Sequence, residues 1–142
     1  IEESVRNKET DFDYKLYGFD ISNAMVKKAE KNIEFSDIDI DIEVVKKDFL
    51  NSKKTDEDKL HILINPPYNK RISADVNELY KKIGDTLKNN YLYSDVWILT
   101  ANLEAIKSIG LRTSKKIKLF NSNLESRLLN YIIYPGTKKN KN

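Results

Sequence analysis

Two periods of apolar residues alternate along this chain, one typical of strands and one typical of helices. Residues 14–20 (YKLYGFD) predict a short strand that ends in Asp20. Ser22 is then expected to cap a helix, whose apolar residues recur at Met25, Val26, Ala29 and Ile33. Isoleucine and valine alternate with acids over residues 38–45, which predicts a second strand with Asp48 and Phe49 just past its end.

The alternation of strands and helices continues through the middle of the chain. The polar run 51–59 predicts a loop, and residues 60–64 predict a third strand, apolar on both faces like a central strand of a parallel sheet. A helix is expected over residues 75–87 and a fourth strand over residues 95–100. Asn102 is then expected to cap a short helix that runs through Ile106 and stops at Gly110.

Two β-like runs close the pattern, at residues 116–120 and 124–134. Asn121, Ser122 and Asn123 between them predict a hairpin. Strands that alternate with helices imply right-handed crossovers, so we expect an α/β fold with a mostly parallel sheet and this antiparallel hairpin at its end. Residues 1–136 are expected to form one domain, and residues 137–142 a flexible basic tail.

Polar residues follow three of the predicted strands at their carboxyl ends, where open α/β sheets bind ligands. Asp20 could accept hydrogen bonds from both hydroxyls of a ribose, or it could only help Ser22 to cap the helix. Asp48 could accept from the amino group of an adenine, with Phe49 or Ile21 against the ring, or it could be an ordinary loop acid. Taken alone, neither acid decides between its two interpretations.

The third of these strands runs into Asn65-Pro66-Pro67-Tyr68. The prolines stiffen the backbone and donate no N–H, so the turn presents a rigid set of acceptors. The Asn65 side-chain oxygen and the Pro66 carbonyl could bind the two hydrogens of a nucleobase amino group, and Tyr68 could stack on the base. The alternative is a polyproline turn that only ends the strand. The position of the motif, at the same predicted sheet edge as Asp20 and Asp48, favours the nucleobase.

Charge is distributed unevenly between the two halves of the chain. Residues 1–71 hold 13 Lys/Arg and 16 Asp/Glu, whereas residues 72–142 hold 12 Lys/Arg and 6 Asp/Glu. This bias suits a polyanion, although a solvated basic surface is about as common. The cations expected to meet phosphate are Lys70, Arg71, Lys115 and Lys116.

Composition argues against a metal site and against a membrane protein. The chain has no cysteine and a single histidine, His61, so we expect no metal centre. No apolar run is long enough to span a bilayer, and the first four residues do not read as a secretory signal. We therefore expect a cytoplasmic protein without a membrane partner.

With these motifs assembled, the chain resembles the THUMP-associated class I S-adenosylmethionine (SAM)-dependent RNA methyltransferases, the group that modifies the 2-amino group of guanine in 23S rRNA. The resemblance covers residues 16–134 and is carried by GFDISNAMVKKAEKN, NPPYNKRI, GDTLKNNY and the distinctive LFNSNLESRLLNY. It implies a Rossmann-like sheet, SAM as cofactor and 23S rRNA as partner.

The resemblance also implies roles for individual residues. Asp20 matches the ribose-binding acid and Asp48 the adenine-binding acid, with Ile21 and Phe49 beside the adenine. The segment Asn65, Pro66, Pro67 and Tyr68 matches the motif that holds the target amine. Arg71 matches the arginine of the group, whereas Asn69 replaces its usual glycine.

One departure from the group is large. The glycine-rich loop that normally contacts the methionine part of SAM is missing, and the four glycines of the chain, Gly18, Gly84, Gly110 and Gly136, are too scattered to form it. Because the strand before that loop lies mid-sheet in the group, we expect two half-sheets with unpaired edges. We interpret the chain as a C-terminal piece of a longer protein, whose other part holds this first strand and a THUMP region.

Two other functions remain open. A shrunken sheet whose edges meet directly would have lost the cofactor, leaving a noncatalytic RNA-binding remnant. A DNA adenine amino-methyltransferase would share Asn-Pro-Pro-Tyr, but it would not account for the C-terminal hairpin.

Overall fold

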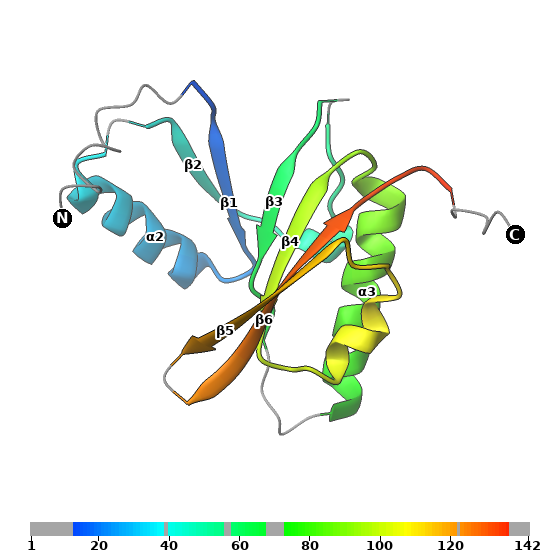
Figure 1. Ribbon diagram of the computed structural model, residues 1–142. Helices are drawn as coiled ribbons and strands as arrows, with labels where there is room; N and C mark the ends of the chain where they lie inside the picture. Colours follow the sequence, from blue (N-terminus) through cyan, green and yellow to red (C-terminus); the bar gives the residue numbers. More distant parts are fainter. Residues whose placement is uncertain (1–12, 39, 56–57, 68–72, 122, 137–142) are drawn as a thin grey trace, which may run out of the picture. The chain divides into compact units, whose positions relative to one another are not determined.

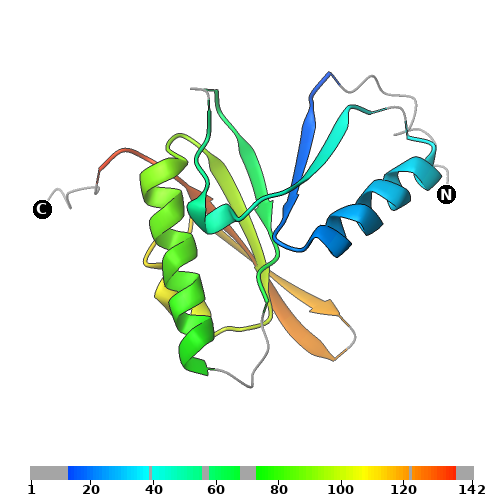
Figure 2. The same ribbon diagram turned by 180° about the vertical axis from the view of Figure 1, so that it is seen from behind.

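The computed structural model describes residues 13–38, 40–55, 58–67, 73–121 and 123–136, and these group into two compact units, residues 1–49 and 50–142 (Figures 1 and 2). Each unit is built around its own sheet. None of the helices in the described ranges is both long and apolar enough to cross a membrane.

The first unit is a strand–helix–strand motif made of β1 (Leu16–Asp20), α2 (Asn23–Ser36) and β2 (Ile42–Lys46). The strands pair in parallel, with Leu16 opposite Ile42 and Asp20 opposite Lys46, and α2 packs on them. Ser22 caps α2 as predicted, because its hydroxyl accepts a hydrogen bond from the Met25 N–H at 3.4 Å.

The prediction for the start of the second strand was wrong. The backbone leaves α2 through Asp37 in the left-handed conformation, with φ of 51°, and Ile38 follows outside any strand with 43% of its surface exposed. The strand begins only at Ile42, because β1 offers its first pairing position at Leu16. The helix is correspondingly longer than its apolar spacing suggested and ends at Ser36.

The second unit holds a four-stranded sheet of β3 (His61–Ile64), β4 (Asp95–Thr100), β5 (Lys115–Asn121) and β6 (Leu124–Ile132). The order is β3-β4-β6-β5, with β3 and β4 parallel and β6 antiparallel to both β4 and β5. The helical segments are η1 (Phe49–Asn51), α3 (Ser73–Asn90) and η2 (Ala105–Ile109), η1 starting at the last residue of the first unit. The predicted α/β class, with parallel strands and a C-terminal hairpin, is confirmed.

The core of the second unit lies between its sheet and α3, with η2 packed beside α3 (Figures 1 and 2). Alternate residues of β4 are fully buried on this face, and the α3 side chains that meet them are equally buried: Val96, Ile98 and Thr100 from the strand, Tyr80, Ile83 and Leu87 from the helix. The hydroxyl groups of Tyr80 and Thr100 share a hydrogen bond, which satisfies both polar groups inside the apolar layer. Tyr131 lies in the same layer, and burial, followed by the neighbouring Tyr80, raises its pKa to about 12.

Two of the glycines serve packing and capping. A Cβ on Gly84 would lie 1.9 Å from the Ile109 carbonyl oxygen, so α3 and η2 can approach this closely only because the residue has no side chain. Gly110 ends η2 in the left-handed conformation, with φ of 64°, as the sequence predicted. Asn102 accepts the Ala105 N–H at 3.0 Å, so it caps the turn where η2 begins.

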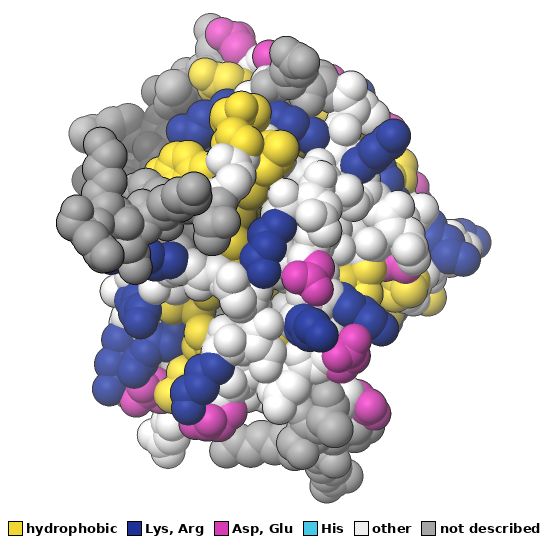
Figure 3. Space-filling view, turned by 90° about the vertical axis from the view of Figure 1, so that its right-hand side faces the viewer, with side chains coloured by type: hydrophobic (Ala, Val, Ile, Leu, Met, Phe, Trp, Pro, Cys, Tyr) yellow, Lys and Arg dark blue, Asp and Glu magenta, His cyan; other side chains and the backbone are white. Residues whose placement is uncertain are grey.

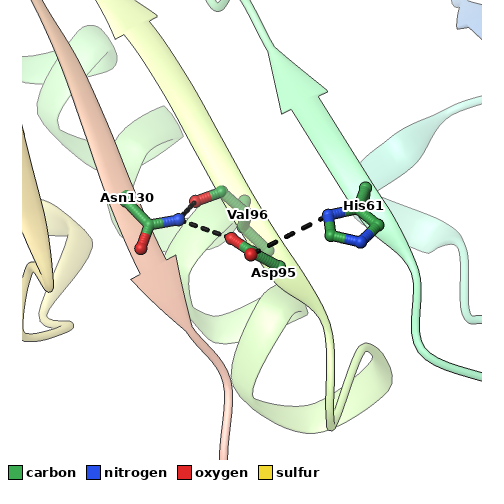
Figure 4. A network of polar contacts seen from close by, with 4 residues as sticks. All are labelled: His61, Asp95, Val96 and Asn130. Atoms are coloured by element: carbon green, nitrogen blue, oxygen red, sulfur yellow. Dashed lines mark hydrogen bonds and ion pairs between the residues drawn. The ribbon is translucent and has the colours of Figure 1, made fainter.

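A polar network joins three strands of the second unit (Figure 4). The buried amide of Asn130 donates to an Asp95 carboxylate oxygen and, at 3.3 Å, to the Val96 carbonyl. The other Asp95 oxygen lies 3.8 Å from Nδ1 of the exposed His61. His61 and Asp95 are the first residues of β3 and β4, so this network lies at the amino ends of the two strands. Asn65 lies at the other end of β3, after its last residue. We assign it a structural role.

The prediction that the third strand is buried on both faces is not met by the described residues. Leu63, on the face opposite α3, is 74% exposed, and β3 pairs with β4 alone. In the other unit β1 pairs with β2 alone. Neither strand pairs with any further strand in the described part of the chain, so the described residues form two sheets, as expected from the missing mid-sheet strand.

Acidic and basic side chains are interspersed on the face that carries α3 and η2, the side drawn in Figure 3. Three ion pairs link neighbouring turns there: Glu78 with Lys82 at 3.9 Å, Asp85 with Lys88 at 3.5 Å and Glu104 with Lys107 at 2.9 Å. This charge-balanced helical surface is a poor match for a polyanion.

Candidate active site

The first unit brings Asp20 and Asp48 to one edge of its sheet. Asp20 is the last residue of β1, and its carbonyl accepts the Lys47 N–H at 3.0 Å, just after the end of β2. Asp48 follows directly. The predicted placement of both acids at adjacent strand ends is therefore confirmed within this unit.

The Asp20 carboxylate is oriented by the turn that follows it. One oxygen accepts the Ser22 N–H at 2.7 Å, which is the helix-entry role that we had weighed as an alternative. A carboxylate has room for several acceptor interactions, so this bond fixes the group and leaves its second oxygen able to accept from a hydroxyl. The two interpretations of Asp20 are thus compatible.

The residues beside the two acids supply apolar surface. Ile21 is 68% exposed, next to Asp20, and Phe49 is half-buried at the start of η1, next to Asp48. Asp48 is itself half-buried. Carboxylates flanked by apolar side chains match the chemistry of a purine nucleoside, whose ring needs a flat apolar contact and whose ribose and amino groups need acceptors.

The second unit places the proline motif where β3 ends. Ile64 is the last strand residue, Asn65 is exposed, Pro66 is buried and Pro67 is exposed. Burial of Pro66 anchors the turn, while the Asn65 amide remains accessible at the carboxyl end of the strand. Tyr68, Lys70 and Arg71 lie outside the described residues, so their predicted roles stay predictions.

Lys115 and Lys116, which were both predicted to meet phosphate, lie on opposite faces of their strand. Both lie on β5 and both are exposed. Successive side chains of a strand point to opposite faces, so Lys115 shares a face with its partner Asn130 and Lys116 with its partner Leu129. The two lysines therefore cannot contact the same phosphate group.

Lys118 and Phe120 were not among the predicted site residues, and both share the face of Lys116. The Lys118 ammonium lies 5.1 Å from the centroid of the Phe120 ring, and 64% of the phenylalanine surface is exposed. The period-two spacing of Lys116, Lys118 and Phe120 was the available signal, since a predicted strand places such residues side by side.

Comparison with known proteins agrees with this architecture. Residues 2–130 match the family model described as RMKL-like, methyltransferase domain. The ribosomal RNA large subunit methyltransferase K/L of Cellvibrio japonicus is 32% identical over 123 residues, and that of Marinobacter nauticus is 32% identical over 124 residues. Among solved structures, a possible methylase from Clostridium difficile 630 superposes with a TM-score of 0.77 at 27% identity, and SMU.472, complexed with SAH, with a TM-score of 0.76 at 25% identity.

The matches cover most of this chain and a small part of the relatives. The alignments span 83% and 84% of the chain but only 16% and 17% of the two curated relatives. The two structural matches span 99% and 96% of the chain, and 37% and 36% of the solved chains. Since the family model extends over nearly all of the described residues, the chain belongs to the RMKL-like methyltransferase domain family.

Proposed function

We propose that this chain is part of an enzyme that transfers a methyl group from SAM to an exocyclic amine of an RNA base, specifically the 2-amino group of guanine in 23S rRNA. The observation that carries the proposal is the motif at the end of β3, in which the buried Pro66 anchors an exposed Asn65 amide. Family membership and the rRNA methyltransferase relatives support the reaction class and the RNA substrate.

The residues of the first unit suit the nucleoside part of SAM. The Asp20 carboxylate, oriented by the Ser22 N–H, would accept from the ribose hydroxyls, and Asp48 would accept from the adenine amino group beside Ile21 and Phe49. The similar structure of SMU.472 was solved with SAH, the demethylated form of this cofactor. When bound, SAM supplies an electrophilic methyl group on its sulfonium.

The residues of the second unit would act on the amine. The Asn65 side-chain oxygen and the Pro66 carbonyl would each accept one N–H, which turns the nitrogen lone pair out of conjugation with the ring and toward the methyl carbon. The methyl carbon would exchange its bond to sulfur for one to nitrogen, the sulfur would keep the bonding electrons, and the nitrogen would lose one proton to solvent. The target base must leave its stack to reach this position.

The test is Asn65→Ala in the complete gene product, with unmethylated 23S rRNA and radiolabelled SAM. We expect methyl transfer to fall by about 100-fold or more, with RNA affinity nearly unchanged, because the amide positions the amine and contributes little to binding the rest of the RNA. Asn32→Ala is the matched control, since Asn32 is an exposed amide on α2. Nucleoside mass spectrometry then identifies the methylated base.

Full activity of Asn65→Ala would remove this residue from the mechanism. RNA binding without any methyl transfer by the unaltered protein would instead support the noncatalytic alternative, and methylated adenine in DNA would support the other. Calorimetric titration with SAM adds a separate measurement. We expect the complete gene product to bind SAM, and the 142-residue chain alone, which lacks the glycine-rich loop, to bind it weakly or not at all.

A further inference from the structure

The tip of the β5–β6 hairpin extends past the end of the sheet at which Asn65 lies. Ile64 pairs with Ile98 in the parallel ladder of β3 and β4, and Thr100, the last residue of β4, pairs with Arg127. β6 begins three residues earlier, at Leu124, so the hairpin continues beyond the carboxyl ends of β3 and β4. All of these residues belong to the second unit.

The register allows the separation between this tip and the proline motif to be estimated. Phe120 is on β5, three strands across the sheet from β3, the strand that Asn65 follows. Along the strand direction, Phe120 lies three residues beyond the β5 residue that is level with Asn65. With strands about 4.8 Å apart and a rise of about 3.3 Å per residue, the two backbones are about 17 Å apart. A few nucleotides of an extended strand span such a distance.

One face of the hairpin tip carries cations around an exposed aromatic ring. We call Lys116, Lys118 and Phe120 the β5 stripe, since alternate strand residues share a face. Their partners across the ladder are Leu129, Arg127 and Glu125. This face thus holds three cations, Lys116, Lys118 and Arg127, and one carboxylate.

Glu125 orders the stripe and neutralises only part of its positive charge. Its two carboxylate oxygens lie 2.9 Å from the Lys118 ammonium and 2.6 Å from an Arg127 guanidinium nitrogen. The hydrogen bond from Lys118 is the largest cause that lowers the pKa of Glu125, so the carboxylate stays ionised and holds both cations in place. Lys116 forms no ion pair with any described residue.

Phe19 and Tyr93 also have a lysine ammonium over the ring, Lys47 at 4.7 Å and Lys54 at 5.9 Å from the centroid. Two further exposed aromatic side chains lack this environment. Tyr17, in the first unit, has the Lys15 ammonium 5.2 Å from its ring, but Glu43 and Asp41 neutralise that lysine at 2.9 and 3.9 Å. Phe35, on α2, is 83% exposed, and no cation is recorded over its ring in the described part of the chain. An exposed ring with surplus positive charge is the combination that single-stranded nucleic acids favour.

We propose that the β5 stripe is a second RNA-contact site, in which Phe120 stacks on an unpaired base a few nucleotides from the methylated one, while Lys116 and Lys118 bind the flanking phosphates. This site deepens the proposed function and depends on it for the identity of the polyanion. The stripe would hold the RNA next to the target, so that the splayed base is presented to Asn65 at high local concentration.

The test measures RNA binding and methyl transfer separately in the complete gene product. Fluorescence anisotropy with a labelled single-stranded fragment of the substrate RNA should show about tenfold weaker binding for Phe120→Ala, while Phe120→Trp retains affinity through its larger ring. Phe35→Ala is the matched control and should bind like the unaltered protein. Circular dichroism checks that each variant is folded.

Salt dependence tests the phosphate contact. The slope of log affinity against log salt should flatten by about 0.7 in Lys116→Ala, the value for one lost contact on a single strand. Lys107→Ala should leave the slope unchanged, because Lys107 is an exposed lysine paired with Glu104 at 2.9 Å. As a second measurement, RNA carrying 5-iodouridine should crosslink under ultraviolet light to the peptide that contains Phe120.

Unchanged affinity of Phe120→Ala, or crosslinks only to other peptides, would overturn the proposal. So would an unaltered protein that does not bind the RNA. These outcomes are distinct from failure of the proposed function, because Asn65→Ala affects methyl transfer whereas the stripe variants affect binding. An active Asn65→Ala protein with weak RNA binding by Phe120→Ala would leave the stripe standing and remove only the proposed chemistry.

Discussion

Replacement of Gly84 by alanine should force α3 and η2 apart. The added Cβ would lie 1.9 Å from the Ile109 carbonyl oxygen and 2.8 Å from its carbon, whereas real Cβ atoms essentially never approach another heavy atom within 3.0 Å. The obstacle is backbone, so it cannot rotate away as a flexible side chain would. Either α3 or η2 must move, which opens the contact that buries Ala105 and Ile109.

The size of the effect follows from two opposing contributions. Overpacking of a well-filled contact costs about 1 to 3 kcal/mol, and a clash with backbone belongs at the upper end of that range. Alanine favours a helix interior over glycine by about 1 kcal/mol, which offsets part of the cost. We therefore expect Gly84→Ala to lower the free energy of unfolding by about 2 kcal/mol, and Tm by roughly 4 to 8 °C.

Urea unfolding followed by circular dichroism measures this change, and Gly18→Ala provides the matched control. At Gly18 a Cβ would meet the Val44 side chain at 3.4 Å, an ordinary van der Waals contact, so the free energy of unfolding should rise or stay within about 0.5 kcal/mol. If Gly84→Ala were as stable as the unaltered chain, the close approach of α3 to η2 could not be the reason for this glycine.

Three further predictions concern buried polar groups. Tyr131→Phe should raise the free energy of unfolding by about 1 kcal/mol, because the buried Tyr131 hydroxyl has no hydrogen-bond partner in the described part of the chain. Tyr80→Phe should lower the free energy of unfolding by about 1 kcal/mol, because the Tyr80 hydroxyl bonds to Thr100. Chemical denaturation compares the two variants. Burial raises the pKa of Tyr131 from 10.0 to about 12, so above pH 10 the folded state binds more protons than the unfolded one, and its stability should fall by about 1 to 2 kcal/mol between pH 10 and 12. Denaturation at pH 9 and pH 11.5 should show this loss to be smaller in Tyr131→Phe, and equal losses would contradict the assignment. Asn130→Ala should lower the free energy of unfolding by about 1 to 3 kcal/mol, since it removes the donor to Asp95 and to the Val96 carbonyl, and a thermal melt unchanged from the original would show that the network contributes nothing.

Local patterns predicted those elements whose ends are marked by chemistry within the element itself. The strand over residues 95–100 has the predicted bounds, and its alternate residues are buried because successive strand side chains point to opposite faces of the sheet. The hairpin was also predicted, from two β-like runs around a short polar turn. Caps at Ser22 and Gly110 marked helix ends for the same reason, since each acts on its immediate neighbours.

Elements that depend on a distant partner were predicted less well. Ile38 alternates with acids as a strand residue would, yet the second strand starts only where β1 pairs with it, at Ile42. Leu63 has the apolar character of a buried strand, but its exposure depends on what covers that face of β3. No pattern within either segment contains this information, because pairing and coverage are properties of the assembled sheet.

For the site, the strand ends could be predicted from the sequence, whereas Lys118 and Phe120 were not singled out. Asp20 and Asp48 were placed at adjacent strand ends from their position after predicted strands, and Asn65 likewise ends β3. That all three serve one pocket stays a prediction. Lys115 and Lys116 were each predicted to meet phosphate, and the period of a strand places them on opposite faces. The same period would have grouped Lys116 with Phe120.

The lysines of β5 also bear on self-association. β5 is the outermost described strand of its sheet, and such a strand presents unpaired backbone groups that a second copy could join. Antiparallel addition of an identical strand in the register that pairs Lys115 with Lys118 would set lysines of one copy against lysines of the other at about 5 Å, on both faces. The repulsion is strongest at low ionic strength and is screened within about 3 Å at 1 M salt. The same charges that would attract a polyanion therefore oppose strand addition at this edge in dilute buffer.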